Sequence, residues 1–104
     1  LDAIMNSEGV PRCECGGVIK PDVVLYGESL DKYTIMGACR EISQADVLIV
    51  AGTSLAVQPA ASFIDYFDGR ELVVINPDAT SADERATLVI RGRVGEAMEK
   101  IVVR

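Results

Sequence analysis

The sequence predicts an α/β fold: a Rossmann-like parallel sheet with flanking helices. Short runs rich in Val, Ile and Leu alternate along the chain with apolar residues at helical spacing, as expected of βαβ units. The aromatic content is 5% with no Trp, which is typical of the aliphatic core of a buried parallel sheet. Strands are expected at residues 21–26, 47–51, 71–75 and 86–90, and helices at 30–43, 59–67 and 94–102.

The segment around Gly52 organises the chain. The apolar run 47–51 is too short for a helix and rich in β-branched residues, so it predicts a central strand buried on both faces. Gly52 ends this run, and two hydroxyl residues, Thr53 and Ser54, follow it. Pro59 then begins a helical pattern. We therefore expect a strand, a glycine turn and a helix whose first backbone N–H groups could face an anion.

The other elements follow from the same kinds of signal. Ser29 or Asp31 can cap the predicted helix 30–43, which connects the strand 21–26 to the next strand and so completes a βαβ unit. The last segment, 94–102, repeats its apolar residues at helical spacing and predicts an amphipathic helix.

Composition limits the possible functions. With 104 residues, 49% of them hydrophobic, the chain can form one globular domain at most. The net charge of -6 argues against nucleic acid or an anionic membrane as a direct partner. No apolar run is long enough to span a membrane and no signal peptide is recognised, so a cytoplasmic location is expected. The chain begins at Leu1 in a loop-like sequence, which suggests part of a longer protein.

The chain has no histidine and three cysteines. Without histidine it has no imidazole base, no histidine zinc ligand and no histidine of a catalytic triad. Cys13 and Cys15 are separated by one residue and followed by Gly16 and Gly17, whereas Cys39 falls in a helical pattern. The odd count fits a reducing compartment. The pair is either half of a structural zinc site, with its other ligands outside this chain, or two unliganded cysteines at a turn.

Small or polar residues follow each predicted strand directly. The carboxyl ends of parallel strands lie along one edge of a sheet, where open α/β folds bind ligands. The small and polar residues therefore predict a nucleotide-sized ligand at this edge. The alternative for each position is an ordinary turn or helix cap. The G-x-G-x-x-G fingerprint is missing, so the chain is not a complete dinucleotide-binding module by itself. The residues are Gly27-Glu28, Gly52-Thr53-Ser54, Asn76 and Gly92-Arg93.

Taken in order and spacing, these motifs resemble the C-terminal part of a sirtuin, the family of NAD-dependent protein lysine deacylases. The resemblance spans nearly all of the chain. It implies that residues 1–20 are the end of a partial zinc ribbon and a connection, and that residues 21–104 are the C-terminal part of the NAD-binding Rossmann-like domain. It rests on Cys13-Glu14-Cys15-Gly16-Gly17, Lys20-Pro21-Asp22-Val23-Val24-Leu25-Tyr26-Gly27-Glu28, Ala45-Asp46, Gly52-Thr53-Ser54-Leu55, Val57, Pro59-Ala60-Ala61 and Ile75-Asn76.

The resemblance also implies roles for individual residues. The NAD-binding residues would be Gly52, Thr53, Ser54, Asn76, Arg93 and Val94, with Asn76 at the adenosine ribose. The residues along the acyl-lysine peptide would be Val24, Tyr26, Gly27, Glu28 and Val57. Cys13 and Cys15 would bind structural zinc, although their one-residue spacing departs from the commoner two-residue spacing of the family. For the aliphatic and aromatic residues, a plain core role is the alternative.

The family's histidine base, the glycine-rich first half of its NAD site and its other zinc cysteines all lie upstream of the matched part. The resemblance therefore implies half of a deacylase that is inactive alone, with an acetyl-lysine peptide and the missing N-terminal half as partners. A non-catalytic nucleotide-binding domain, such as the middle domain of thiamine-diphosphate enzymes, is the alternative, but it gives no role to Cys13 and Cys15. A small redox or metal module built on that pair is a third hypothesis.

Overall fold

The computed structural model describes residues 1–102, which form two compact units. The first unit is Leu1–Leu30 and the second begins at Asp31. In the first unit a short helix, α1 (Asp2–Met5), precedes an isolated antiparallel bridge between Arg12 and Val18. This boundary reflects where contacts within the chain are fewest. It does not test the division into domains expected after residue 20, which stays a prediction.

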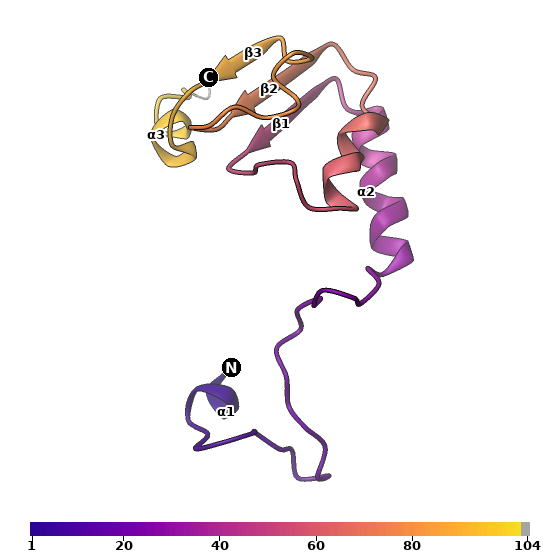
Figure 1. The fold of residues 1–104 in the computed structure, drawn as a ribbon, viewed down its shortest axis with the longest axis vertical. Helices are drawn as coiled ribbons and strands as arrows, with labels where there is room; N and C mark the ends of the chain where they lie inside the picture. Colours follow the sequence, from indigo (N-terminus) through magenta and orange to yellow (C-terminus); the bar gives the residue numbers. More distant parts are fainter. Residues whose placement is uncertain (103–104) are drawn as a thin grey trace. The chain divides into compact units, whose positions relative to one another are not determined.

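The second unit alternates helices and strands as far as β2, and a loop then leads directly to β3, as the sequence pattern predicts (Figure 1). Its elements are α2 (Lys32–Gln44), β1 (Val47–Ala51), η1 (Ala60–Tyr66), β2 (Glu71–Ile75), β3 (Leu88–Ile90) and α3 (Val94–Met98).

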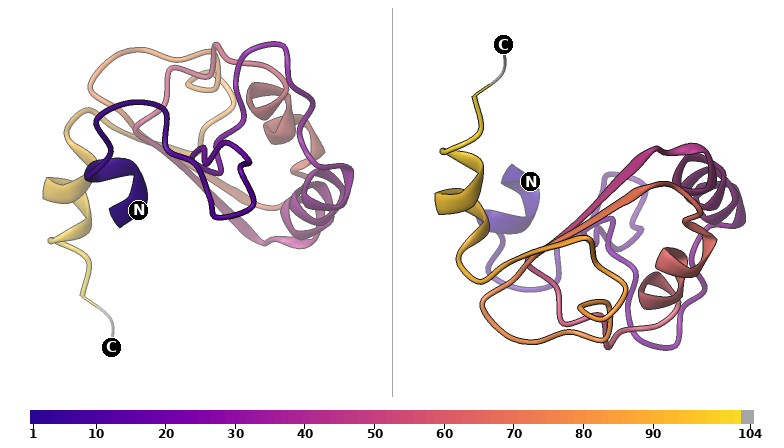
Figure 2. Two further views of the ribbon diagram at one scale, coloured as in Figure 1. Left: turned by 90° about the horizontal axis from the view of Figure 1, so that it is seen from below. Right: turned by 90° about the horizontal axis from the view of Figure 1, so that it is seen from above.

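The strands form one parallel sheet in the order β1-β2-β3. Ala51 pairs with Ile75, and Ile75 pairs with Ile90, so the three strands end in register. Their carboxyl ends therefore lie along a single edge, and the chain segments leaving them can be followed in the two views of Figure 2. The expectation of a Rossmann-like parallel sheet with flanking helices is confirmed for this unit.

The core lies on one face of the sheet. Leu72 and Val74 of β2 pack there with Ile64 of η1 and with Ala82 from the loop before β3. Val47 and Ile49 point to the opposite face and are about half exposed, at 51% and 49%. A parallel sheet is normally covered on both faces. On this second face Ile75 of β2 is buried, at 1% exposed, so the apolar surface left exposed lies along β1.

Two strand predictions were wrong. Residues 21–26 form no strand, because the backbone of a strand needs a hydrogen-bonded neighbour and the unit that contains them offers none. β1 was expected at the centre of the sheet but pairs only with β2 within residues 1–102, which makes it an edge strand. β2 is the central strand.

The helices follow the predictions with one change of type and one of length: α3 ends at Met98, four residues before the expected end at 102. Asp31 caps α2, since its carboxylate accepts hydrogen bonds from the backbone N–H and the hydroxyl of Thr34 at 2.7 and 2.9 Å. The helix after Pro59 is a 3₁₀ helix of 7 residues and not an α-helix. Within residues 1–102, no helix has both the length and the apolar character needed to cross a membrane.

Candidate functional site

The turns that leave β1 and β2 are tied to the neighbouring strands. The backbone N–H of Gly52 donates to the carbonyl of Ile75 at 3.0 Å, and that of Asn76 donates to the carbonyl of Ile90 at 3.1 Å. These bonds continue the parallel ladder by one residue on each strand. Gly52 and Asn76 are therefore fixed on the same carboxyl edge of the sheet, as the sequence predicted.

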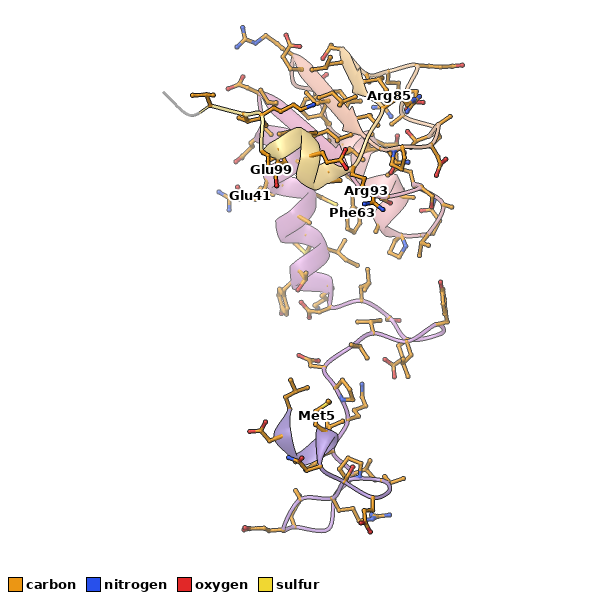
Figure 3. The ribbon with its side chains drawn as sticks, turned by 90° about the vertical axis from the view of Figure 1, so that its left-hand side faces the viewer. Met5, Glu41, Phe63, Arg85, Arg93 and Glu99 are labelled. Carbon is orange, nitrogen blue, oxygen red and sulfur yellow. A yellow bond between two sulfur atoms is a disulfide. The ribbon has the colours of Figure 1, made fainter. Side chains whose placement is uncertain are left out.

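Gly52 also packs closely against the start of α3. Its φ is +64°, a backbone conformation that favours glycine, and a β-carbon built on it would lie 3.3 Å from Val94 Cγ2. Arg93 is the N-cap residue of α3 and is labelled in Figure 3. Gly52 and Val94, which are distant in sequence, thus meet at this edge.

The turn after Gly52 is held by a side chain. The backbone N–H of Leu55 donates to the hydroxyl of Thr53 at 3.1 Å, and Leu55 itself has a φ of +54°, unusual for a residue with a branched side chain. Thr53 and Ser54 are exposed. The alternative role as a helix cap is wrong, because η1 begins only at Ala60 and no side-chain hydrogen bond caps it.

The same observation corrects the expected anion site at a helix N-terminus. The helix does not begin directly after Gly52, and η1 is a short 3₁₀ helix with Pro59 at its N-cap. The polar groups available near Gly52 are instead the backbone of the turn and the two hydroxyls of Thr53 and Ser54.

Asn76 is the buried polar residue of this edge, only 7% exposed. Its Nδ2 atom donates to the carbonyl of Asp78 at 3.0 Å. Among residues 1–102 no donor reaches its Oδ1 atom, and no buried side-chain oxygen or nitrogen of that range lacks a partner. The Oδ1 atom therefore has solvent access and is free to accept a hydrogen bond from a ligand.

A polar cluster that the sequence analysis did not identify supports the loop after Asn76. Arg91 forms an ion pair with Asp83, and Thr80 donates to the same carboxylate from its backbone and its hydroxyl. The hydrogen bonds from Arg91 first, and those from Thr80 second, lower the pKa of Asp83 to about 2. The Thr80-x-x-Asp83 spacing is a capping-type signature that could have indicated part of this cluster.

The residues expected along a peptide are divided between the two units. Val57 belongs to the second unit, whereas the other four belong to the first, so their mutual placement stays a prediction. Within the first unit, Gly27 has a φ of +89° and Glu28 closes a tight turn: its backbone N–H donates to Leu25, and its carboxylate accepts from the Leu25 N–H at 3.1 Å. Tyr26, at the tip of this turn, is 96% exposed.

Cys13 and Cys15 lie on one turn of the first unit. The N–H of Cys13 donates to the carbonyl of Gly17, and the N–H of Gly16 donates to the carbonyl of Cys13, both at 2.9 Å. The two sulfurs are joined as a disulfide, which is the oxidised form of the pair. Within residues 1–102, no group of three or more His, Cys, Asp or Glu side chains is placed to hold a metal. A zinc site that includes Cys13 and Cys15 therefore stays a prediction.

A cavity of about 170 Å³ lies away from the predicted site. It lies near Leu72 and Thr87, at the amino ends of β2 and β3. The predicted site is at the opposite, carboxyl ends of these strands. Its lining residues are Phe67, Asp68, Gly69, Arg70, Leu72, Arg85 and Thr87.

Fold and edge together define the class: part of an open parallel α/β domain, with a carboxyl edge built from small and polar residues of the kind that binds nucleotides. The model of the Sir2 family matches residues 1–59. The chain belongs to the Sir2 family. This decides against the thiamine-diphosphate middle domain and against a separate redox module.

The relatives agree with this assignment. The chain is 52% identical over 101 residues to an NAD-dependent protein deacetylase of Clostridium perfringens, covering 95% of this chain and 41% of that protein. A Sir2 homologue mutant solved with ADP-ribose matches with a TM-score of 0.81 and 40% identity, over 91% of this chain and 39% of the other. A Sir2 structure with a p53 peptide and NAD+ matches with a TM-score of 0.80 and 34% identity, over 95% and 42%. The chain thus spans about two fifths of the length of these relatives.

Proposed function

We propose that this chain supplies NAD-binding and acyl-lysine-peptide-binding surface to an NAD-dependent protein lysine deacylase. The single observation that carries the proposal is the carboxyl edge of the sheet, where Gly52, Asn76 and Val94 come together in a chain of the Sir2 family. Relatives described as NAD-dependent protein deacetylases, and a homologue solved with ADP-ribose, support it.

The residues of this edge fit an adenine nucleotide. Gly52 keeps the turn close against Val94, Thr53 and Ser54 offer exposed hydroxyls, and Asn76 offers an amide oxygen with solvent access. Arg93 and Val94 would border the nucleotide at the start of α3. When bound, NAD would supply the electrophilic ribose carbon, which the acyl oxygen of the substrate would attack as nicotinamide leaves.

For the substrate we infer an extended acyl-lysine peptide that pairs with backbone on two sides. Val24, Tyr26, Gly27 and Glu28 would contribute one side, and Val57 would contribute to the other. The exposed ring of Tyr26 supports this role, because an aromatic ring buries a large apolar surface when it packs on a ligand. Backbone pairing of this kind tolerates many peptide sequences. A Sir2 relative solved with a p53 peptide supports a peptide substrate.

We further propose that, in the reducing cytoplasm, Cys13 and Cys15 supply two thiolates to a structural zinc ion. The other two ligands would come from the rest of the parent protein. The turn that brings the sulfurs together supports this role, and the disulfide would be the form that cannot bind metal.

The missing N-terminal half is the proposed partner of this chain. With no histidine in the sequence, the chain has no imidazole base, and we propose that it has no deacylase activity alone. Val47 and Ile49 are half exposed, and one edge of β1 pairs with no other strand within residues 1–102. Both features support a sheet that continues with strands from that half.

Nicotinamide release tests the proposal. The full-length parent protein is incubated with NAD and an acetyl-lysine peptide, with the unacetylated peptide as control. We expect nicotinamide only with the acetylated peptide, and none from the 104-residue chain alone. No release by the intact, zinc-loaded protein would refute the proposed activity, and release by the pure chain would refute its dependence on an upstream base.

A further inference from the structure

Arg91 connects two points of the loop between β2 and β3. Its Nη1 atom donates to the carbonyl of Asp78 at 3.0 Å, and its Nη2 atom donates to the carboxylate of Asp83. The Thr80 hydroxyl donates to the other carboxylate oxygen of Asp83 at 2.7 Å. The guanidinium plane is thus fixed at two points, which a planar group with several donors can provide.

The carbonyl of Asp78 also receives the amide of Asn76. The Asn76 Nδ2 atom donates to it at 3.0 Å, so this oxygen accepts one bond from Asn76 and one from Arg91. A carbonyl oxygen accepts two hydrogen bonds, and both positions are filled. Because the carbonyl can bond only to the NH₂ end of the amide, the Oδ1 atom of Asn76 must point away from it.

We propose that Asp83 and Arg91 are positioning residues for nucleotide binding. Asp83 holds Arg91, Arg91 holds the Asp78 carbonyl, and that carbonyl orients the amide of Asn76 so that its Oδ1 atom accepts a hydroxyl of the ligand. The inference rests on the proposed function, which gives Asn76 its role at the adenosine ribose. It adds that the affinity for the adenosine half of NAD depends on residues that do not touch the ligand.

The test uses the full-length protein and ADP-ribose as the probe, with the dissociation constant measured by calorimetry. The variants are Asn76→Ala, Asp83→Asn and the double variant. Asp83→Asn keeps the size of the side chain and removes the charge that holds Arg91. Asp65→Asn is the matched control, because it removes the charge from a second Arg–Asp pair, between Arg85 and Asp65 at 2.7 Å.

We expect Asn76→Ala and Asp83→Asn each to weaken ADP-ribose binding by about 3- to 10-fold, the effect of one net hydrogen bond. In the Asn76→Ala background, Asp83→Asn should change the affinity by less than about 2-fold, since its effect passes through Asn76. The control Asp65→Asn should bind as the wild type does. A merely structural role of Asp83 would instead give an additive loss in the double variant.

The outcomes separate this inference from the proposed function. Wild-type affinity in Asp83→Asn, or a fully additive double variant, would overturn the positioning role while leaving Asn76 at the site. Wild-type affinity in Asn76→Ala would overturn the proposed nucleotide site and this inference with it.

Discussion

A β-carbon on Gly52 would lie 3.3 Å from Val94 Cγ2, so the turn after β1 and the start of α3 are in direct contact. This contact joins two segments that are far apart in sequence, and both belong to the proposed nucleotide edge.

Gly52→Ala should lower the free energy of unfolding of the full-length protein by about 1–2 kcal/mol, because alanine is disfavoured at a positive φ. It should also weaken ADP-ribose binding, since Val94 must move. Urea unfolding and calorimetry measure the two effects. Gly95→Ala is the control: nothing lies within 4 Å of its β-carbon and it is helical, so stability should not fall. Equal stability of the two variants would contradict the role of Gly52.

Gly69→Ala should destabilise the protein without a direct effect on the nucleotide edge. A β-carbon there would lie 2.2 Å from the carbonyl oxygen of Ala45 and 2.5 Å from the ring of Phe67, so backbone would have to shift. We expect a loss of about 1–3 kcal/mol or more in urea unfolding. In Gly37→Ala, where α2 offers open space, stability should rise slightly. Wild-type stability of Gly69→Ala would show that the connection from η1 to β2 can shift without cost.

Asp83 should make stability depend on pH in the acidic range. Its folded-state pKa of about 2 lies below the unfolded value of about 3.9, so its contribution is fully present above pH 4 and is lost as the pH falls toward 2. The difference in thermal midpoint between wild type and Asp83→Asn should therefore shrink between pH 4 and pH 2. A difference that stays constant from pH 5 to pH 2 would show that the ion pair with Arg91 does not form.

The 104-residue chain alone should self-associate, because one edge of β1 has no partner strand among the described residues and Ile49 on this strand is 49% exposed. Light scattering at increasing concentration measures this. Ile49→Lys should reduce self-association of the chain and, in the full-length protein, should impair assembly of the sheet. A monomer of the unmodified chain at high concentration would contradict the prediction.

The full-length protein purified under reducing conditions should contain about one zinc ion per chain. Cys13→Ser should lower the zinc content and the thermal midpoint together. Metal analysis by mass spectrometry gives the first value. Cys39→Ser is the control, since Cys39 lies in α2, outside the turn. Zinc content that Cys13→Ser leaves unchanged would remove Cys13 from the proposed site.

Sequence patterns predicted the second unit well, because its strands are short apolar runs that glycine and polar residues end. β1 and β2 have the predicted bounds, whereas β3 begins two residues later than expected at Leu88. The run 21–26 has the same composition as a strand but no partner strand in its unit, and a local pattern cannot reveal a missing partner.

At the site, parallel strands bring Gly52 and Asn76 to one edge, which was predictable from strand order. Val94 was expected there only from the resemblance to the sirtuins. The ion pair of Asp83 with Arg91 was not predictable, since it depends on how a loop folds back on itself. The 3₁₀ type of η1 was also not predictable, because apolar spacing does not distinguish a short 3₁₀ helix from an α-helix.

The most direct measurement for the central claim is a crystal structure of the full-length protein with ADP-ribose. The account predicts the adenosine ribose against Asn76 Oδ1, with Gly52 and Val94 beside the nucleotide. ADP-ribose bound elsewhere, for example in the cavity at the amino ends of β2 and β3, would contradict it.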